Sequence, residues 1–172
     1  MLRLIAGLSF SLIASLSLLA QNPQSDDVRS VFGNVKKYAL ASAEKMPEEH
    51  YGFQPTPDVR TFAALLGHIA DSNYSLCASA KPTRRPEAQV EKSMKTKQEL
   101  IQGLKDAFAF CDAAYNALTD ANGAEMVKLF GRDRTRAGAL NFNNAHSYEH
   151  YGNLVTYMRM KGLVPPSSEG RR

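Results

Sequence analysis

The chain has 172 residues, of which 44% are hydrophobic and 22% are charged, a composition typical of one globular domain with its own core. Its formal net charge of +4 at pH 7 is spread along the sequence and is not gathered in one basic stretch. Because no basic run is interleaved with aromatic residues, the sequence predicts no nucleic-acid partner.

Residues 1–20 have the features of an export signal. Arg3 supplies a short basic start, an apolar stretch follows, and Ala20 offers a cleavage point. The sequence therefore predicts a periplasmic or secreted protein, with residues 21–24 as a polar tether and residues 25–165 as the folded domain. Retention of the signal as an uncleaved anchor is the alternative, since its apolar stretch is close to the minimum length of a membrane span.

A first amphipathic helix is predicted by apolar residues that recur at helical spacing from Val28 onward. Ser25 can cap this helix and Pro47 closes it. Residues 47–60 contain three prolines, which predicts an ordered crossing segment without a helix. His50 lies in this segment beside two glutamates, a setting typical of a solvated histidine rather than of a metal ligand.

Thr61 can cap a second helix, whose apolar stripe continues through Ala78. A third helix is predicted to begin in the region Glu87–Ser93 and to end at Leu118. The break between the two helices contains two prolines, and we interpret it as the turn of an antiparallel hairpin.

The two cysteines, Cys77 and Cys111, fall on the second and third predicted helices. If the chain turns near residue 86 into an antiparallel hairpin, the two sulfur atoms lie roughly 24 Å apart along the helix axis. We therefore expect two free thiols, with Cys111 acting as a small core residue.

A long connection is predicted for residues 119–134, with a short apolar run that lies across the end of the domain. Thr135 can cap a fourth helix that ends at Lys161-Gly162, and residues 166–172 form a polar tail. Four amphipathic segments without an alternating strand pattern predict an all-α fold, an antiparallel four-helix bundle.

The fourth helix contains a pair of histidines, His146 and His150, on one face. Residues four apart on a helix have Cβ atoms about 5–6 Å apart, so the two imidazoles can reach one metal ion. His68 could supply a third nitrogen if the second and fourth helices face each other. Three imidazoles with an open coordination position describe a catalytic type of metal site. Histidines that pack or hydrogen-bond without metal are the alternative.

Three stretches carry a family resemblance, in this order along the chain: PEEHYGFQPTPDVR at residues 47–60, FAALLGHIADSNY at residues 62–74 and NNAHSYEHYGNLVTYMRMKGLVPPSS at residues 143–168. Together they resemble the DinB/YfiT-like superfamily of damage-inducible proteins and proposed metal-dependent hydrolases. The resemblance implies a four-helix bundle in which His68, His146 and His150 hold a divalent ion. Members that use low-molecular-weight thiols work in the reducing cytosol, a setting that an export signal does not fit.

Two further residues near the histidine pair are candidates for a role. The stretch spells H-x-x-E-H, the inverted zincin pattern, with Glu149 as a general base. On a helical wheel Glu149 points away from both histidines, which favours a surface or interhelical ion pair. Asn153, one turn beyond His150, is either a pocket group or a buried amide that is satisfied by nearby backbone.

The leading hypothesis is an exported metal-dependent hydrolase that acts on an unidentified small-molecule substrate. Its ion would lower the pKa of a coordinated water and polarise the substrate. The alternatives are a non-catalytic protein that binds a metal or a small molecule, and a metal-free helical scaffold. Zinc is the first expectation for the ion and nickel the second. The tyrosines and methionines of the last helix are compatible with a homodimer.

Overall fold

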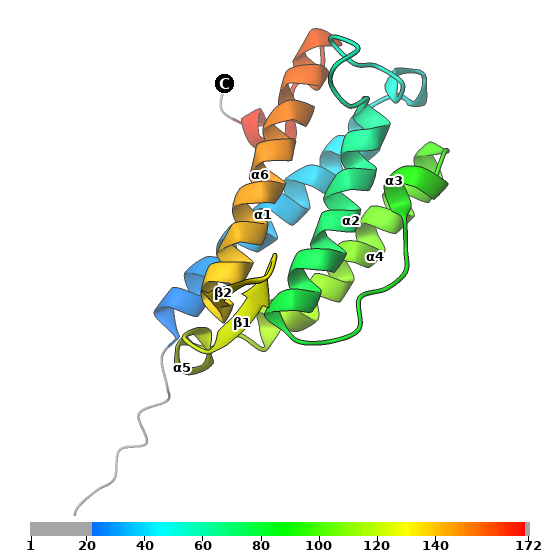
Figure 1. The fold of residues 1–172 in the computed structure, drawn as a ribbon. Coiled ribbons are helices and arrows are strands. Elements are labelled where there is room, and N and C mark those ends of the chain that lie inside the picture. Colours follow the sequence, from blue (N-terminus) through cyan, green and yellow to red (C-terminus); the bar gives the residue numbers. More distant parts are fainter. Residues whose placement is uncertain (1–21, 171–172) are drawn as a thin grey trace, which may run out of the picture.

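The computed structural model describes residues 22–170, and the predicted export signal lies outside them. Four long helices lie side by side (Figure 1): α1 (Pro23–Lys45), α2 (Phe62–Ala80), α4 (Lys97–Asn116) and α6 (Arg136–Met160). The shorter elements are η1 (Glu48–His50), α3 (Val90–Ser93), α5 (Asp120–Gly123), β1 (Met126–Leu129), β2 (Arg132–Thr135) and η2 (Pro166–Ser168). The prediction of a mainly helical domain is confirmed.

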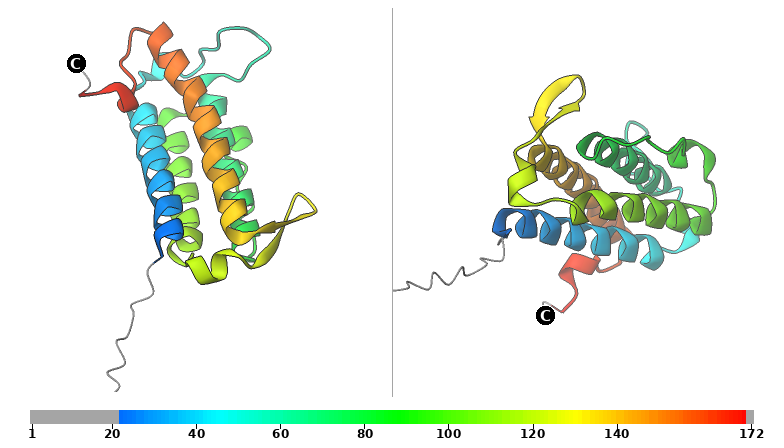
Figure 2. Two further views of the ribbon diagram at one scale, coloured as in Figure 1. Left: turned by 90° about the vertical axis from the view of Figure 1, so that its left-hand side faces the viewer. Right: turned by 90° about the horizontal axis from the view of Figure 1, so that it is seen from below.

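The directions of the long helices differ from the predicted antiparallel order. Helices α1 and α6 run one way, and α2 and α4 run the other way (Figures 1 and 2). Near their starts, Gly67 of α2 and Gly103 of α4 both pack closely against α3. Further along, Cys77 of α2 is bonded to Cys111 of α4, so the two helices are parallel neighbours. The chain makes this possible by returning along the outside of the domain through residues 81–96.

The expectation of two free thiols was wrong. Cys77 and Cys111 form a disulfide, with their Cα atoms 5.3 Å apart. The expected separation assumed a tight turn near residue 86, which would place the cysteines at different levels. In the parallel pair both residues lie at the same level, and both side chains are fully buried.

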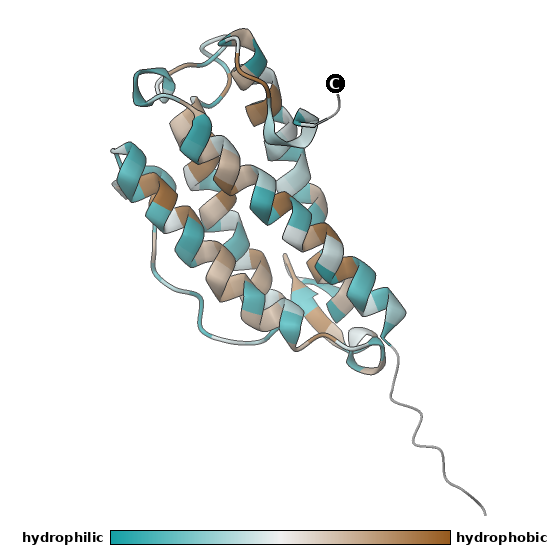
Figure 3. Ribbon diagram, turned by 180° about the vertical axis from the view of Figure 1, so that it is seen from behind, coloured by the Kyte–Doolittle hydropathy of each residue, from teal (hydrophilic) through white to brown (hydrophobic). Residues whose placement is uncertain are grey.

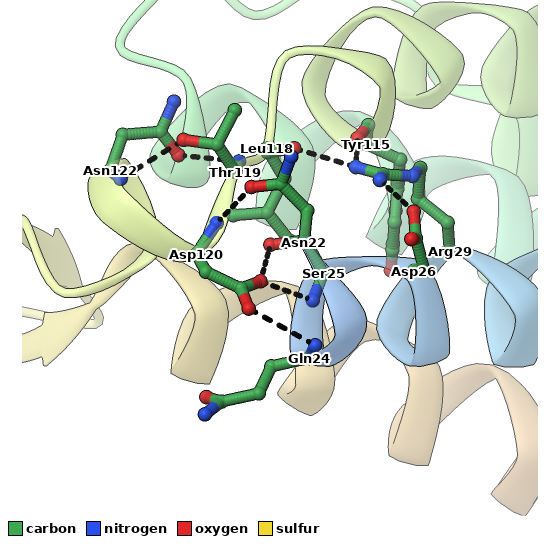
Figure 4. A network of polar contacts seen from close by, with 10 residues as sticks. All are labelled: Asn22, Gln24, Ser25, Asp26, Arg29, Tyr115, Leu118, Thr119, Asp120 and Asn122. Carbon is green, nitrogen blue, oxygen red and sulfur yellow. Dashed lines mark hydrogen bonds and ion pairs between the residues drawn. The ribbon is translucent and has the colours of Figure 1, made fainter. Parts of the chain in front are cut away.

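Helix α1 begins at Pro23, so Pro23 and Gln24 are helical and are not part of a tether. Its free N–H groups are satisfied from another element (Figure 4): the Asp120 carboxylate accepts from the backbone of Ser25 at 2.7 Å and of Gln24 at 3.3 Å. The Ser25 hydroxyl also donates to Asp120, and this bond holds the pKa of that carboxyl below its ordinary value. Asn22 accepts in return from the Asp120 backbone. A carboxylate at a helix N-terminus is electrostatically favoured.

The other helix boundaries follow local capping chemistry. The side chains of Thr61 and Thr135 accept backbone N–H groups at the starts of α2 and α6, as predicted. The predicted third helix is divided into α3 and α4, because Thr96 forms a capping box with Glu99 and starts a new helix there.

Residues 126–135 form a β-hairpin that the sequence did not predict. Strands β1 and β2 are antiparallel, and Met126 pairs with Thr135 at the base. Phe130 and Gly131 form the tip, with φ angles of 51° and 74°. The hairpin stands out from the side of the domain near the start of α6 (Figure 2).

The core lies between the four long helices, where aromatic and aliphatic side chains such as Phe32, Leu66, Phe108 and Leu154 are almost fully buried. Hydrophilic and hydrophobic residues alternate along the helices, as expected for helices with one buried face (Figure 3). The predicted polar tail also packs on the domain, because the Tyr151 hydroxyl donates to Ser167 at 2.8 Å. Among the described residues, no helix is both long enough and apolar enough to cross a membrane.

Candidate metal centre and adjacent pocket

The structure brings the three predicted histidines together. His68 comes from α2, and His146 and His150 come from the facing side of α6. The potential ligand atoms of the three side chains all lie within 4.8 Å of one another. The centroid of the His68 ring lies 5.2 Å from that of His146 and 4.6 Å from that of His150.

Contacts on both sides of the cluster fix the register of α2 against α6. On one side the Tyr157 hydroxyl donates to the carbonyl of Arg60 at 2.9 Å. On the other side the Asn73 amide donates to the Ser147 hydroxyl at 3.4 Å. His68 lies between these two contacts, so the antiparallel register places it opposite the histidine pair.

The geometry of the α6 pair fits a shared ion. Nε2 of His146 lies 3.2 Å from Nε2 of His150. Two imidazole nitrogens that bind one zinc ion at about 2.0–2.1 Å are roughly 2.8–3.4 Å apart when the angle between them is near 90–110°. The same separation also fits a hydrogen bond between two neutral imidazoles, which is the metal-free alternative.

Glu91 of α3 is a member of the site that sequence reasoning missed. Its Oε2 lies 3.4 Å from Nδ1 of His68, and its Oε1 accepts from Nε of Arg60 at 2.9 Å. The Asp71 carboxylate anchors α3 beside α2 by accepting the backbone N–H groups of Val90 at 2.8 Å and Glu91 at 3.1 Å. A carboxylate beside Nδ1 favours the proton there and leaves Nε2 of His68 for an ion.

Burial keeps the imidazoles neutral. It lowers the pKa of His68, and the nearby Arg60 guanidinium adds to this effect. It also lowers the pKa of His146 and lowers that of His150 to about 4, and the neighbouring histidines reinforce both changes. Neutral imidazole is the form that binds metal, so the site is ready for an ion at neutral pH. Within the described residues, Nδ1 of His146 and of His150 is buried without a hydrogen-bond partner.

The other candidates lie outside the cluster. His50 is part of η1, and the three-histidine group does not include it. Glu149 is exposed and forms no ion pair with any described residue, although its charge partly offsets the lowered pKa of both α6 histidines. Asn153 is exposed, so the interpretation of Asn153 as a buried amide was wrong.

A pocket of about 320 Å³ adjoins the histidines. It lies where residues 81–89 and the tip of the hairpin pass beside α2 and α6. Its lining consists of two of the histidines and six further side chains: His68, His146, Asp71, Ser72, Ser75, Leu76, Arg85 and Phe130. The candidate metal centre therefore opens onto a space of small-molecule size.

Residues 34–154, which include all three histidines and Glu91, match the family model of the DinB superfamily. The chain belongs to the DinB superfamily. Among curated relatives, this DinB-superfamily protein is 25% identical over 142 residues to the uncharacterized protein YjoA of Bacillus subtilis (strain 168), a match that covers 81% of the chain and 92% of YjoA.

Solved structures share the fold. A DinB-like protein from Bacillus cereus ATCC 10987 superimposes with a TM-score of 0.69 at 17% identity, covering 82% of this chain and 95% of that one. The structure of B. subtilis YjoA gives 0.64 at 23% identity, with coverage of 79% and 92%. A mycothiol-dependent maleylpyruvate isomerase gives 0.61 at 13% identity, with coverage of 76% of this chain and 60% of that one. At these identities the likeness establishes the fold alone.

Proposed function

We propose that this DinB-superfamily protein is an exported metal-dependent enzyme of the hydrolase type, which binds a divalent ion through His68, His146 and His150. The observation that carries the proposal is the convergence of three neutral imidazoles from two helices at the wall of a pocket. The substrate is a small molecule that fits that pocket.

The number of ligands favours catalysis over a structural role. A structural zinc site is normally closed by four protein ligands, whereas a catalytic site keeps a position open. Within the described residues, no fourth histidine, cysteine or acidic side chain belongs to the group whose ligand atoms all lie within 4.8 Å of one another. When bound, a divalent ion supplies Lewis acidity to the pocket. The three imidazoles hold the ion, Glu91 orients His68, and the remaining pocket walls hold the substrate.

The disulfide supports export. Disulfides persist in oxidising compartments and are rare in the reducing cytosol, and the bond between Cys77 and Cys111 is buried in the core. It therefore favours hydrolysis over the second candidate function, a reaction that consumes a cytosolic thiol. That second candidate is suggested by the structural likeness to a mycothiol-dependent isomerase.

Zinc is the ion that we propose first, and nickel second. Imidazole ligands suit both ions, and a pocket without a thiolate or a closed set of oxygen ligands gives no preference for copper(I) or calcium.

The test is elemental analysis of the mature protein, purified without a histidine tag. We expect about one divalent ion per chain, with loss of the ion in His68→Ala and in His150→Ala. His50→Ala is the matched control and keeps its metal, because His50 lies outside the cluster. If the wild type holds no ion after incubation with zinc and nickel followed by desalting, the proposal is wrong. Turnover of a panel of esters and amides then separates an enzyme from a non-catalytic metal-binding protein.

A further inference from the structure

The pocket beside the histidines contains a cation without a partner. Arg85 is exposed and, among the described residues, makes no ion pair or hydrogen bond. Its neighbour Arg84 is paired with Glu87, and Arg60 is paired with Glu91. Arginine presents a planar fork of N–H donors that matches carboxylate and phosphate-type groups. The free guanidinium therefore provides a place for an anionic group.

The acid in the same pocket, Asp71, does not form an ion pair with Arg85. Both oxygens of the Asp71 carboxylate accept backbone N–H groups from α3, and no ion pair joins Asp71 to any described residue. A divalent ion at the adjacent centre would make the pocket clearly positive.

Phe130 forms an apolar part of the pocket wall. The residue is 72% exposed, and its backbone has a φ of 51°, in the left-handed region that suits glycine or asparagine. Its ring lies edge-on to Phe142, 5.7 Å between centroids, and Phe142 in turn stacks 6.4 Å from His146.

The turn conformation and the exposure of Phe130 both cost free energy, and the ring buries little in return. Backbone strain of this kind concentrates at functional sites. Phe130 also lines the pocket, which is an independent reason to expect that its ring contacts a bound ligand. An aromatic ring at such a position offers a flat surface on which another flat group can stack.

We propose that the pocket binds an organic anion with a flat apolar body, whose anionic group is held by Arg85 and whose body packs against Phe130. The proposal rests on the proposed function, because it names the substrate class of the same site. The hydroxyls of Ser72 and Ser75 provide additional hydrogen-bonding groups in the pocket. The volume of about 320 Å³ admits a ligand of the size of a substituted benzoate.

The experiment uses probes that separate charge from shape. Benzoate and phenylphosphonate combine an anionic group with a flat body, benzamide keeps the body without the charge, and acetate keeps the charge without the body. Binding is measured by chemical-shift titration of the ¹⁵N-labelled mature protein, in metal-free and zinc-loaded forms. We expect saturable binding of the two aromatic anions, with shifts that centre on the pocket, and weaker binding of benzamide and acetate.

Two variants test the two contacts. Arg85→Gln should weaken benzoate binding by about tenfold or more and leave benzamide unchanged, whereas Arg84→Gln is the matched control and should bind like the wild type. Phe130→Asn should weaken the binding of all three aromatic probes without lowering the melting temperature, because asparagine tolerates the left-handed turn. The proposal is overturned if Arg85→Gln binds benzoate as tightly as the wild type does. It is also overturned if the wild type binds benzoate and benzamide with equal affinity.

The two proposals fail in different ways. Metal binding without probe binding contradicts the ligand class and leaves the metal centre intact. If the chain never retains an ion, but the metal-free protein binds the probes and needs Arg85 to do so, the ligand class is supported and the metal-dependent function is contradicted. Probe binding that needs zinc and survives Arg85→Gln shows that the ion alone holds the anion, and it overturns the role of Arg85.

Discussion

The carboxylate of Glu91 lies 3.4 Å from Nδ1 of His68, although the two residues belong to different helices. Glu91 reaches this position because Asp71 holds the start of α3 against α2, and Arg60 holds the other carboxylate oxygen. A ligand histidine with a carboxylate on its second nitrogen is oriented before an ion arrives.

Glu91→Gln should therefore weaken zinc binding by about tenfold or more, because the amide no longer stabilises the Nδ1 proton of His68 as a carboxylate does. The measurement is competition with a zinc chelator at neutral pH. Glu87→Gln is the matched control on the same connection, since within the described part of the chain Glu87 pairs only with Arg84, at the surface. Equal zinc affinity in both variants and in the wild type would contradict a role for Glu91.

Acid should destabilise the metal-free protein. The folded chain holds the pKa of His150 at about 4, below its ordinary value of 6.5. Between these values the unfolded chain binds more protons, so the free energy of unfolding falls as the pH is lowered through this window. The difference between the two pKa values limits this loss to about 3 kcal/mol. His150 can approach the limit because it is only 8% exposed.

Urea unfolding of the metal-free wild type at pH 7 and pH 4.5 measures this loss. His150→Asn should lose less stability over the same interval, because the side chain that takes up the proton is gone. A wild type and variant with the same pH dependence would rule out His150 as the group responsible.

The disulfide should contribute about 4 kcal/mol to the free energy of unfolding, as expected from the chain entropy of a closed loop with a sequence separation of 34. Replacement of both cysteines by alanine should lower the urea midpoint accordingly. Thiol titration of the unreduced protein in denaturant gives the direct check. Two reactive thiols per chain, in place of none, would show that the bond does not form.

Tyr115→Phe should destabilise the fold by about 1–3 kcal/mol and leave the metal content unchanged. The buried hydroxyl accepts from Nδ2 of Asn143 at 3.1 Å, and it lies 2.9 Å from the Leu140 carbonyl and 2.8 Å from Oδ1 of Asn144. Phenylalanine keeps the ring and leaves these partners without the hydroxyl. Tyr38→Phe is the control, since the Tyr38 hydroxyl has no hydrogen bond within the described residues. A similar change in both variants would contradict the role of the network.

Local chemistry was sufficient to predict most of the long helices and the histidine pair of α6. The apolar spacing of α1, α2 and α6 and the caps at Thr61 and Thr135 depend on nearby residues only, so they could be read from the sequence. The pair His146 and His150 is likewise a property of one helix. The addition of His68 needed the family resemblance, because it depends on which helices face each other.

The features that were missed depend on the path of the chain. A proline-rich stretch after Ala80 fits a tight turn as well as a long return, so the sequence did not distinguish antiparallel from parallel neighbours. The disulfide and the place of Glu91 both follow from that return. The hairpin was missed for a different reason: its strands have four residues each, and its turn has Phe130 where asparagine, aspartate or glycine usually precedes the glycine.

The bond between Cys77 and Cys111 also makes a covalent ring of the chain segment that carries Arg85 and Glu91 past the site. A protease that cuts the exposed part of this ring, for example after Arg84, leaves two fragments that are still joined through sulfur. The nicked molecule would keep its helices packed and would separate into two pieces only after reduction. If the protein is exported, as we propose, a single cut in this exposed connection would leave it in one covalently joined piece.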